Sequence, residues 1–288
     1  MLEMVIETRL HNIGAFDVGR VLPFRKRRMV GPFIFFDRMG PQHFAAPITT
    51  DADVLPHPHT GLATVTYLFE GTMTHRDSLG VQQQIRPGEL NWMSAGSGIS
   101  HSERFDDMRP TGGTLDGIQA WVALPKEFEE SDPSFQHFDT AQLPLLEDTH
   151  YSGRLIAGKA FGCEAPVDVF SPLFYVDLQV KAGGRIPLPS AYSERAIYVA
   201  KGVIEYGGHR YEAGHMLVFA VGADPDVRAV GDARVMLLGG ESVGERFMWW
   251  NFVASSKERL EQAKADWQSG RIALPPMDNE AYIPLPEQ

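Results

Sequence analysis

Two short segments contain the residue types that bind metal ions. His57 and His59 are separated by one residue, and so are His101 and Glu103. In an extended strand, side chains at positions i and i+2 point to the same face. If the two segments lie side by side in a sheet, they present three imidazoles and one carboxylate to a common point. A lone His-x-His pair is often a coincidence of surface histidines, but two such pairs joined by a β-rich segment favour a metal site.

The donor set restricts the choice of metal. Structural zinc sites are usually rich in cysteine, whereas this chain has a single cysteine, Cys163. Three neutral imidazoles and one carboxylate suit Fe, Mn, Ni, Cu or Zn. We expect one divalent ion per chain, and availability in a reducing compartment favours Fe(II). Four ligands on one side of an octahedron leave two adjacent positions for water, dioxygen or a chelating substrate.

Glu103 is also the candidate catalytic residue, because a carboxylate that detaches from a metal can act as a general base. Pro56 and Pro58 precede the two histidines of the first segment and cannot donate to a sheet ladder. This segment is therefore expected at the edge or mouth of a barrel, where a ligand can enter. His75 lies in a neighbouring predicted strand, either as a pocket residue behind the ligands or as a surface histidine.

The elements that must position these residues are short strands. The chain has 28 Gly and 20 Pro, which favour frequent turns. Strand-forming runs such as residues 62–68, 81–85, 90–93 and 118–124 alternate with Gly/Pro turns, a pattern typical of a β-sandwich or barrel. Near the end, Ser255 and Ser256 can cap one helix that stops before Gly270. We predict an all-β fold with one short C-terminal helix.

One β-unit occurs twice in the sequence. Residues 67–75 align with 198–206, and residues 86–93 align with 212–219. In the second copy the ligand positions fall on or near Leu188, Ser190, Val227 and Ala229. A polar stretch over 126–143 interrupts the strand pattern. We therefore predict a metal-binding barrel over residues 1–130 and a barrel without a metal site over residues 131–288, which ends in the helix and an extended tail.

Charge and hydropathy exclude several classes of partner. The formal net charge of −11 argues against direct nucleic-acid binding. The basic run at residues 25–28 is either a solvated face or a contact for an anionic partner. No apolar run is long enough to cross a bilayer, and the N-terminus lacks the pattern of a signal peptide. We expect a cytoplasmic protein with no membrane partner.

Dense motifs extend over most of the chain, at residues 28–37, 57–61, 64–71, 75–80, 85–88, 92–103 and 249–253. They resemble the pirin family of the cupin superfamily. The resemblance implies a bicupin, two tandem β-barrels with one iron in the N-terminal barrel, and its ligands match the four predicted residues one for one. Ala63 and Arg38 stand where many members carry Glu and His, which bears on the substrate rather than on the metal.

The resemblance leaves two functions open. Some members resemble quercetin 2,3-dioxygenases, so the first hypothesis is a dioxygenase that cleaves quercetin or a related flavonol, or another enolisable aromatic, with O2. Under it, Glu103 accepts the proton of the substrate hydroxyl group. Other members are iron-dependent partners of transcription factors, so the second hypothesis is a non-enzymatic regulatory protein whose metal tunes a surface for a protein partner. Metal-dependent oxygen uptake with quercetin would separate the two.

Overall fold

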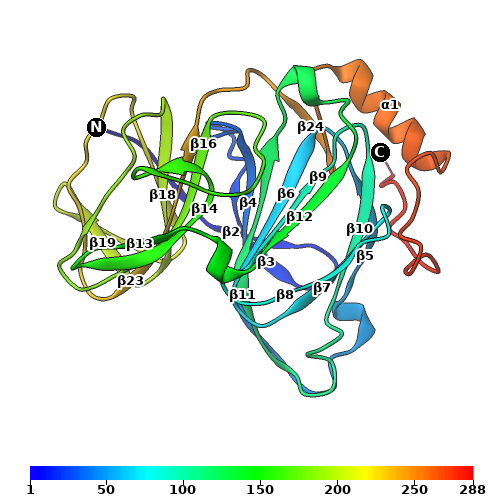
Figure 1. Cartoon of the computed structure of the whole chain (residues 1–288), viewed down its shortest axis with the longest axis horizontal. Coiled ribbons are helices and arrows are strands. Elements are labelled where there is room, and N and C mark those ends of the chain that lie inside the picture. Colours follow the sequence, from blue (N-terminus) through cyan, green and yellow to red (C-terminus); the bar gives the residue numbers. More distant parts are fainter. Residues whose placement is uncertain (288) are drawn as a thin grey trace. The chain divides into compact units, whose positions relative to one another are not determined.

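The chain folds almost entirely as β-sheet, and the computed structural model describes residues 1–287 (Figure 1). The predicted all-β class is confirmed. Within the described residues the only α-helix is α1 (Lys257–Gln268), and single 3-10 turns occur at Thr50–Ala52, Lys126–Phe128 and Thr140–Gln142. In this part of the chain no helix combines the length and hydropathy needed to span a membrane.

Backbone contacts group the chain into two compact units, each assembled from segments that are distant in sequence. We name one unit the first barrel; it comprises His11–Val18, Met39–Thr140 and Gly244–Gln288. We name the other the second barrel; it comprises Met1–Leu10, Gly19–Arg38 and Ala141–Val243. This grouping differs from the contiguous split between residues 130 and 131 that the sequence suggests.

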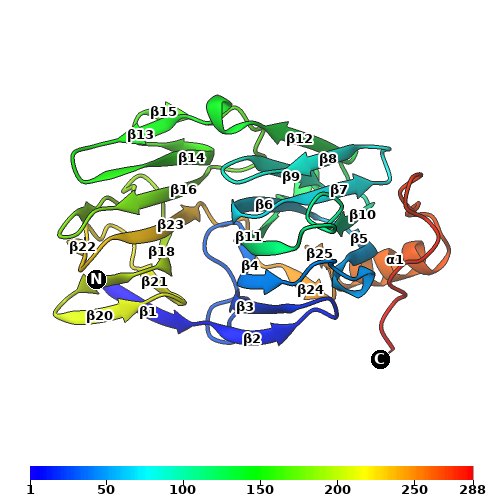
Figure 2. The same ribbon diagram turned by 90° about the horizontal axis from the view of Figure 1, so that it is seen from below.

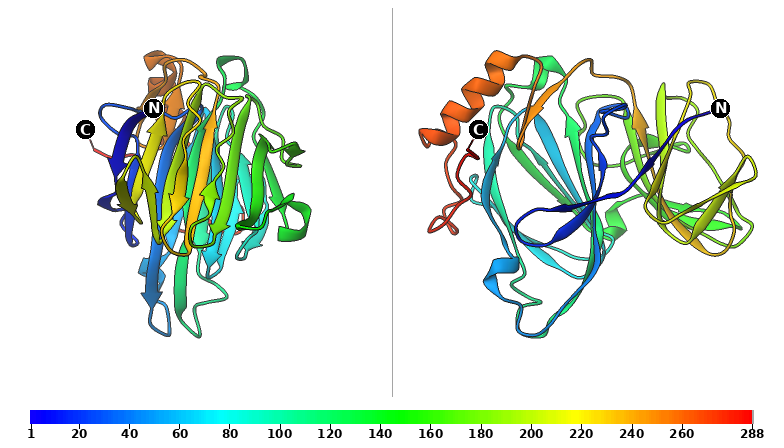
Figure 3. Two further views of the ribbon diagram at one scale, coloured as in Figure 1. Left: turned by 90° about the vertical axis from the view of Figure 1, so that its left-hand side faces the viewer. Right: turned by 180° about the vertical axis from the view of Figure 1, so that it is seen from behind.

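Specific contacts explain why each end of the chain belongs to the barrel that is built mainly from the other half of the sequence. β1 (Leu2–Glu7) pairs antiparallel with β21 (His215–Phe219), so the N-terminal segment extends a sheet of the second barrel (Figure 3). At the other end, Arg246 Nη2 donates to the Leu124 carbonyl oxygen at 2.9 Å, and Arg246 Nε lies 3.2 Å from a Glu129 carboxylate oxygen. These buried contacts place the helix and the tail with the first barrel.

Two sheets form the framework of the first barrel (Figure 2). The smaller sheet has the order β5 (Val54–His59), β10 (Ile99–Arg104), β7 (Met73–Asp77), β8 (Gln82–Ile85). The larger has the order β12 (Ser134–Phe138), β9 (Leu90–Ser94), β6 (Leu62–Glu70), β11 (Gly113–Ala123), β4 (Phe33–Phe44), β3 (Asp17–Leu22), β2 (Arg9–Asn12). Only parts of β4, β3 and β2 belong to the first barrel, because Gly19–Arg38 and Met1–Leu10 are grouped with the second. Buried apolar side chains from both sheets form one core cluster, among them Leu68, Met73, Ile85 and Leu115.

Strand β12 was not expected from the polar composition of residues 126–143. It pairs along its whole length with β9, from Ser134 opposite Ser94 to Phe138 opposite Leu90. The polar character has a structural reason, because β12 is the edge strand of its sheet and each of its five residues is only partly buried.

The second barrel repeats the arrangement, which confirms the predicted internal repeat. Its smaller sheet has the order β17 (Arg185–Ile186), β22 (Val227–Ala229), β19 (Val203–Tyr206), β20 (His209–Glu212), and so follows the same chain order as β5-β10-β7-β8. Its larger sheet has the order β1, β21, β18 (Glu194–Lys201), β23 (Ala233–Gly240), β16 (Leu173–Val180), β14 (Tyr151–Ala160), β13 (Leu145–Glu147), with β15 (Cys163–Glu164) beside β14.

The C-terminal helix begins and ends as predicted. The Ser256 side chain accepts a hydrogen bond from the Arg259 backbone N–H at 3.2 Å, and Gly270 follows the helix with φ +73°. The buried face of α1 packs in one apolar cluster with Phe252 of the hairpin β24 (Phe247–Trp249) and β25 (Phe252–Ala254). The residues of that face are the apolar positions Leu260, Ala263 and Trp267.

Candidate metal centre

The three predicted histidine ligands lie together in the first barrel. β5 and β10 are antiparallel neighbours, and His101 lies opposite His57 in the register. His59 shares a face with His57, as the i, i+2 spacing requires. One ring nitrogen from each residue lies within 4.8 Å of the others, and the ring centroids are 4.5, 5.0 and 5.1 Å apart.

Local backbone chemistry fixes the position of these histidines. β5 is the edge strand of its sheet. Proline has no backbone N–H, and an edge strand tolerates Pro56 and Pro58 because its unpaired side needs no donor. Just beyond, Gly61 has φ +68°, and a Cβ atom there would lie 2.0 Å from the Val253 carbonyl oxygen. Only glycine fits this turn, which ends β5 and directs the chain into β6.

The histidine cluster is buried and held neutral. The exposed fractions of His57, His59 and His101 are 8%, 1% and 1%. Burial lowers the pKa of His57 to about 4. Burial, followed by the charge of the neighbouring imidazoles, lowers the pKa of His59 and of His101 well below the ordinary histidine value. At neutral pH each ring therefore carries one N–H and one lone pair.

The hydrogen bonds of the outer ring nitrogens decide which nitrogen faces inward. Nδ1 of His57 lies 2.8 Å from the Leu55 carbonyl oxygen, and Nδ1 of His59 lies 3.2 Å from that of Asn251. Both Nδ1 atoms must donate, which leaves Nε2 as the lone pair. The Nε2 atoms of His59 and His101 are buried and have no hydrogen-bond partner. Buried polar atoms rarely remain unsatisfied, so this donor set fits a metal ion.

A buried His–Asp pair supports His101 from behind. His75 Nδ1 lies 3.2 Å from His101 Nδ1, and His75 Nε2 lies 2.9 Å from Asp77 Oδ2. Because the carboxylate only accepts, His75 donates from Nε2 and accepts at Nδ1 the proton of His101. The Nε2 lone pair of His101 is then directed inward. We expected His75 either as a pocket residue behind the ligands or as a surface histidine, and the structure places it in the buried position. Sequence reasoning missed Asp77, although its i, i+2 spacing from His75 was the available signal.

Glu103 is buried on the same strand as His101 but lies outside the group of three histidines. A bulge in the β5–β10 ladder falls between His101 and Glu103. Glu103 Oε1 accepts a hydrogen bond from Gln119 Nε2 at 3.4 Å, and Gln119 Oε1 accepts one from Thr66 at 2.7 Å. Burial raises the pKa of Glu103 to about 7, against the lowering effect of its hydrogen bonds with Thr66 and Gln119. Sequence reasoning did not single out Gln119 or Thr66.

The opposite face of β10 is held by the C-terminal tail. Asp278 receives two hydrogen bonds from the Arg104 guanidinium, at 2.8 and 2.6 Å, and one from Ser102 at 2.6 Å. Ser100 Oγ donates to the Ala273 carbonyl oxygen at 2.6 Å. Residues 100, 102 and 104 alternate with the site residues 101 and 103, so the tail fastens the outer face of the ligand strand.

Comparison with known proteins agrees with this geometry. Residues 15–122 match the Pirin family, and residues 175–273 match the Pirin C-terminal cupin domain. The chain belongs to the pirin family. A pirin-like protein of Caulobacter vibrioides is 54% identical over the full length of both chains.

Solved structures of pirins and cupins extend the comparison. A quercetin 2,3-dioxygenase from Acinetobacter baumannii is 35% identical, with a TM-score of 0.90 over 99% of this chain and 95% of that one. The Escherichia coli pirin YhhW, solved in complex with nickel(II), is 20% identical with a TM-score of 0.62, over 83% of this chain and 99% of that one, and shows the shared fold. The two barrels are therefore cupin-like, and the buried histidine cluster fits a cupin metal site.

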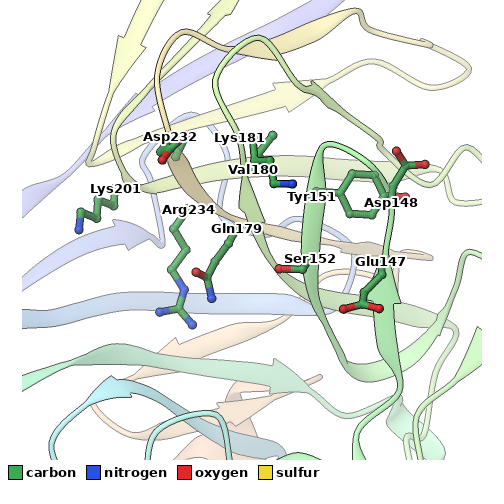
Figure 4. A pocket seen from close by; sticks show the side chains of 11 residues that line it. Glu147, Asp148, Tyr151, Ser152, Gln179, Val180, Lys181, Lys201, Asp232 and Arg234 are labelled. Carbon is green, nitrogen blue, oxygen red and sulfur yellow. The ribbon is translucent and has the colours of Figure 1, made fainter.

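A hollow lies in the second barrel (Figure 4). It has a volume of about 910 Å³. Its charged side chains are of both signs, namely Lys181, Lys201 and Arg234 with Glu147, Asp148 and Asp232. Arg234 is bound to Asp177 by two hydrogen bonds, at 2.8 and 2.5 Å. None of the predicted site residues lines this hollow.

Proposed function

We propose that this pirin is a metal-dependent dioxygenase that cleaves quercetin or a related flavonol with O2. One tightly held divalent ion per chain, with Fe(II) favoured over Mn, Ni, Cu and Zn, is bound by His57, His59, His101 and Glu103. The observation that carries the proposal is the pair of buried Nε2 atoms without hydrogen-bond partners. The similarity to the Acinetobacter baumannii dioxygenase over nearly the whole chain supports the reaction class.

When bound, the ion supplies Lewis acidity and the redox chemistry that dioxygen requires. The protein supplies the rest. The buried Glu103 carboxylate accepts the proton of the flavonol hydroxyl group, because burial raises its affinity for a proton while the Gln119 amide holds one of its oxygens. His75 and Asp77 keep the tautomer of His101 fixed.

The side chains around the cluster limit access of water. The indole ring of Trp121 packs edge-to-face on His59, with 5.1 Å between ring centroids. Phe135 stacks on His75 at 4.4 Å. The aromatic ring that packs on the cluster favours an aromatic substrate.

The test measures oxygen uptake with quercetin as a function of bound metal. The parent, loaded with Fe(II), should consume oxygen in proportion to its iron content, and His59→Ala should lose both the metal and the uptake. His209→Ala, at an exposed position of the second barrel, is the matched control and should behave like the parent. If the iron-loaded parent consumed no oxygen with any flavonol, the regulatory hypothesis with a protein partner would replace this proposal.

A further inference from the structure

A second group of metal-binding side chains lies at the edge of the larger sheet of the first barrel. Glu89 immediately precedes β9, His137 lies in β12, and Asp139 immediately follows β12. One ligand atom from each residue lies within 4.8 Å of the others. We propose that these three residues form a second, exchangeable site for a divalent cation of the zinc type, separate from the tightly held ion of the buried centre.

The distances at this site fit a shared cation better than direct hydrogen bonds. His137 Nε2 lies 3.5 Å from Asp139 Oδ1 and 3.8 Å from Glu89 Oε2. Both distances exceed the usual N–H···O range of about 2.7–3.2 Å. Two ligand atoms that are each about 2.0–2.1 Å from a tetrahedral zinc ion lie about 3.4 Å apart. Small side-chain movements would therefore place all three atoms around one ion.

Two of the three ligands are already oriented. His137 Nδ1 lies 2.7 Å from Asn91 Oδ1, its neighbour across the strand pair, so Nδ1 donates and Nε2 faces the two carboxylates, where its lone pair is available to a cation in the neutral ring. The Glu89 side chain is 11% exposed, and its Oε2 accepts the Arg86 backbone N–H at 2.8 Å.

The local charge favours a cation. The carboxylates of Glu89 and Asp139 approach each other within 4.8 Å, an arrangement that positive charge stabilises. Arg86 Nη1 lies 4.0 Å from Glu89 Oε1, on a side chain that is 59% exposed. One imidazole nitrogen and two carboxylates, completed by water, are a donor set that Zn²⁺ accepts.

Binding at this site would fasten an edge strand. β12 has one neighbour, β9, and the proposed ligands join the end of β12 to the start of β9. Phe135, two residues before His137 on the same strand, stacks on His75 behind the buried centre. A bound cation would therefore stabilise the strand that holds this aromatic ring in place.

The experiment titrates Zn²⁺ by calorimetry into protein whose buried centre is already loaded. The parent should bind one additional Zn²⁺. Asp139→Asn should weaken this additional binding by more than about 100-fold, a larger loss than the 10–100-fold typical of an outer-shell substitution. The Asp139 side chain is 69% exposed, so the change should leave the core intact. His137→Ala should have the same effect.

The matched control is His215→Ala in β21 of the second barrel. His215 Nε2 faces a single carboxylate, that of Glu7 at 3.9 Å, and this variant should bind Zn²⁺ as the parent does. Zn²⁺ should also raise the melting temperature of the parent and of His215→Ala, but not that of Asp139→Asn. Equal Zn²⁺ binding by the parent and both ligand variants would overturn the proposal, and so would the absence of additional binding in the parent. Neither result depends on flavonol turnover.

Discussion

The two barrels share one strand order but differ in the side chains that their smaller sheets carry at the positions of the metal site. Thr74 and Glu205 both lie three residues after the turn glycines Gly71 and Gly202, and their partners across the ladder are Arg104 and Arg228. This register makes Val227 the counterpart of Glu103 and Pro225 that of His101, a shift of two residues from the alignment based on sequence. Neither counterpart can bind a metal.

The replacement has an energetic consequence. In the second barrel, Val227, which takes the place of Glu103, is fully buried. Burying one such side chain contributes about 1.5–3 kcal/mol to stability. In the first barrel, His59 and His101 bury ring nitrogens without partners, which costs about 1–3 kcal/mol for each such group. The comparison indicates that the strand order persists without the predicted ligands, and that the first barrel is stabilised less at these positions when no metal is bound.

Glu103→Gln should produce the largest effect that separates the barrels. An amide has no useful proton affinity near neutral pH, and loss of a general base costs about 10²–10⁴ in rate. The amide oxygen can still coordinate, so metal content should fall much less than turnover. The measurement is flavonol-dependent oxygen uptake per bound metal, together with the absorption band of the bound flavonol, which should remain that of the neutral form. If the Glu103→Gln variant turned over at the parent rate per bound metal, Glu103 would act only as a ligand and not as a base.

Removing one ligand should abolish tight metal binding in the first barrel. His59→Ala should reduce the metal content of purified protein well below one per chain, while far-ultraviolet circular dichroism stays that of the parent. Ser190→Ala, near the corresponding position of the second barrel, should leave metal content unchanged. Equal metal content in His59→Ala and Ser190→Ala would contradict the assignment of the metal to the first barrel. A second tightly bound ion near Leu188 and Val227 would contradict it as well.

Asp77→Asn should have an intermediate effect on the metal. The amide can donate to His75 Nε2, which reverses the tautomer of His75 and opposes the Nδ1–H of His101. Loss of such a supporting carboxylate typically weakens metal affinity about 10–100-fold. A competition titration with a chelator measures the affinity. Asp226→Asn, at an exposed position of the second barrel, serves as the control and should keep the parent affinity.

These features differ in how far the sequence could reveal them. The histidine pairs follow from the two-residue period of a strand, and the helix follows from its serine cap and terminal glycine. The support of His101 by His75, and of Glu103 by Gln119, depends on the register between strands, which one sequence does not contain. The exchange of the chain ends depends on pairing between residues more than 200 positions apart, such as Glu7 and His215.

The smallest expected effect concerns the stability of the metal-free protein in mild acid. Because the folded pKa of His57 is lowered to about 4 from 6.5, the unfolded chain binds more protons between these values, and stability falls as pH drops from 7 to 5. This residue alone costs about 2 kcal/mol over that interval. Glu103 acts in the opposite direction, because its folded pKa is raised to about 7 from 4.5. Its protonation adds about 2 kcal/mol to the stability of the folded protein as pH drops from 7 to 5.

His59 and His101 decide the net sign, because their lowered pKa values act in the same direction as that of His57. The melting temperature of the metal-free parent should therefore fall between pH 7 and pH 5. Glu103→Gln removes this opposing group, so its melting temperature should fall more steeply with pH than that of the parent. Differential scanning calorimetry on both proteins, stripped of metal, measures the two slopes. Equal slopes would show that Glu103 does not gain a proton inside the folded barrel.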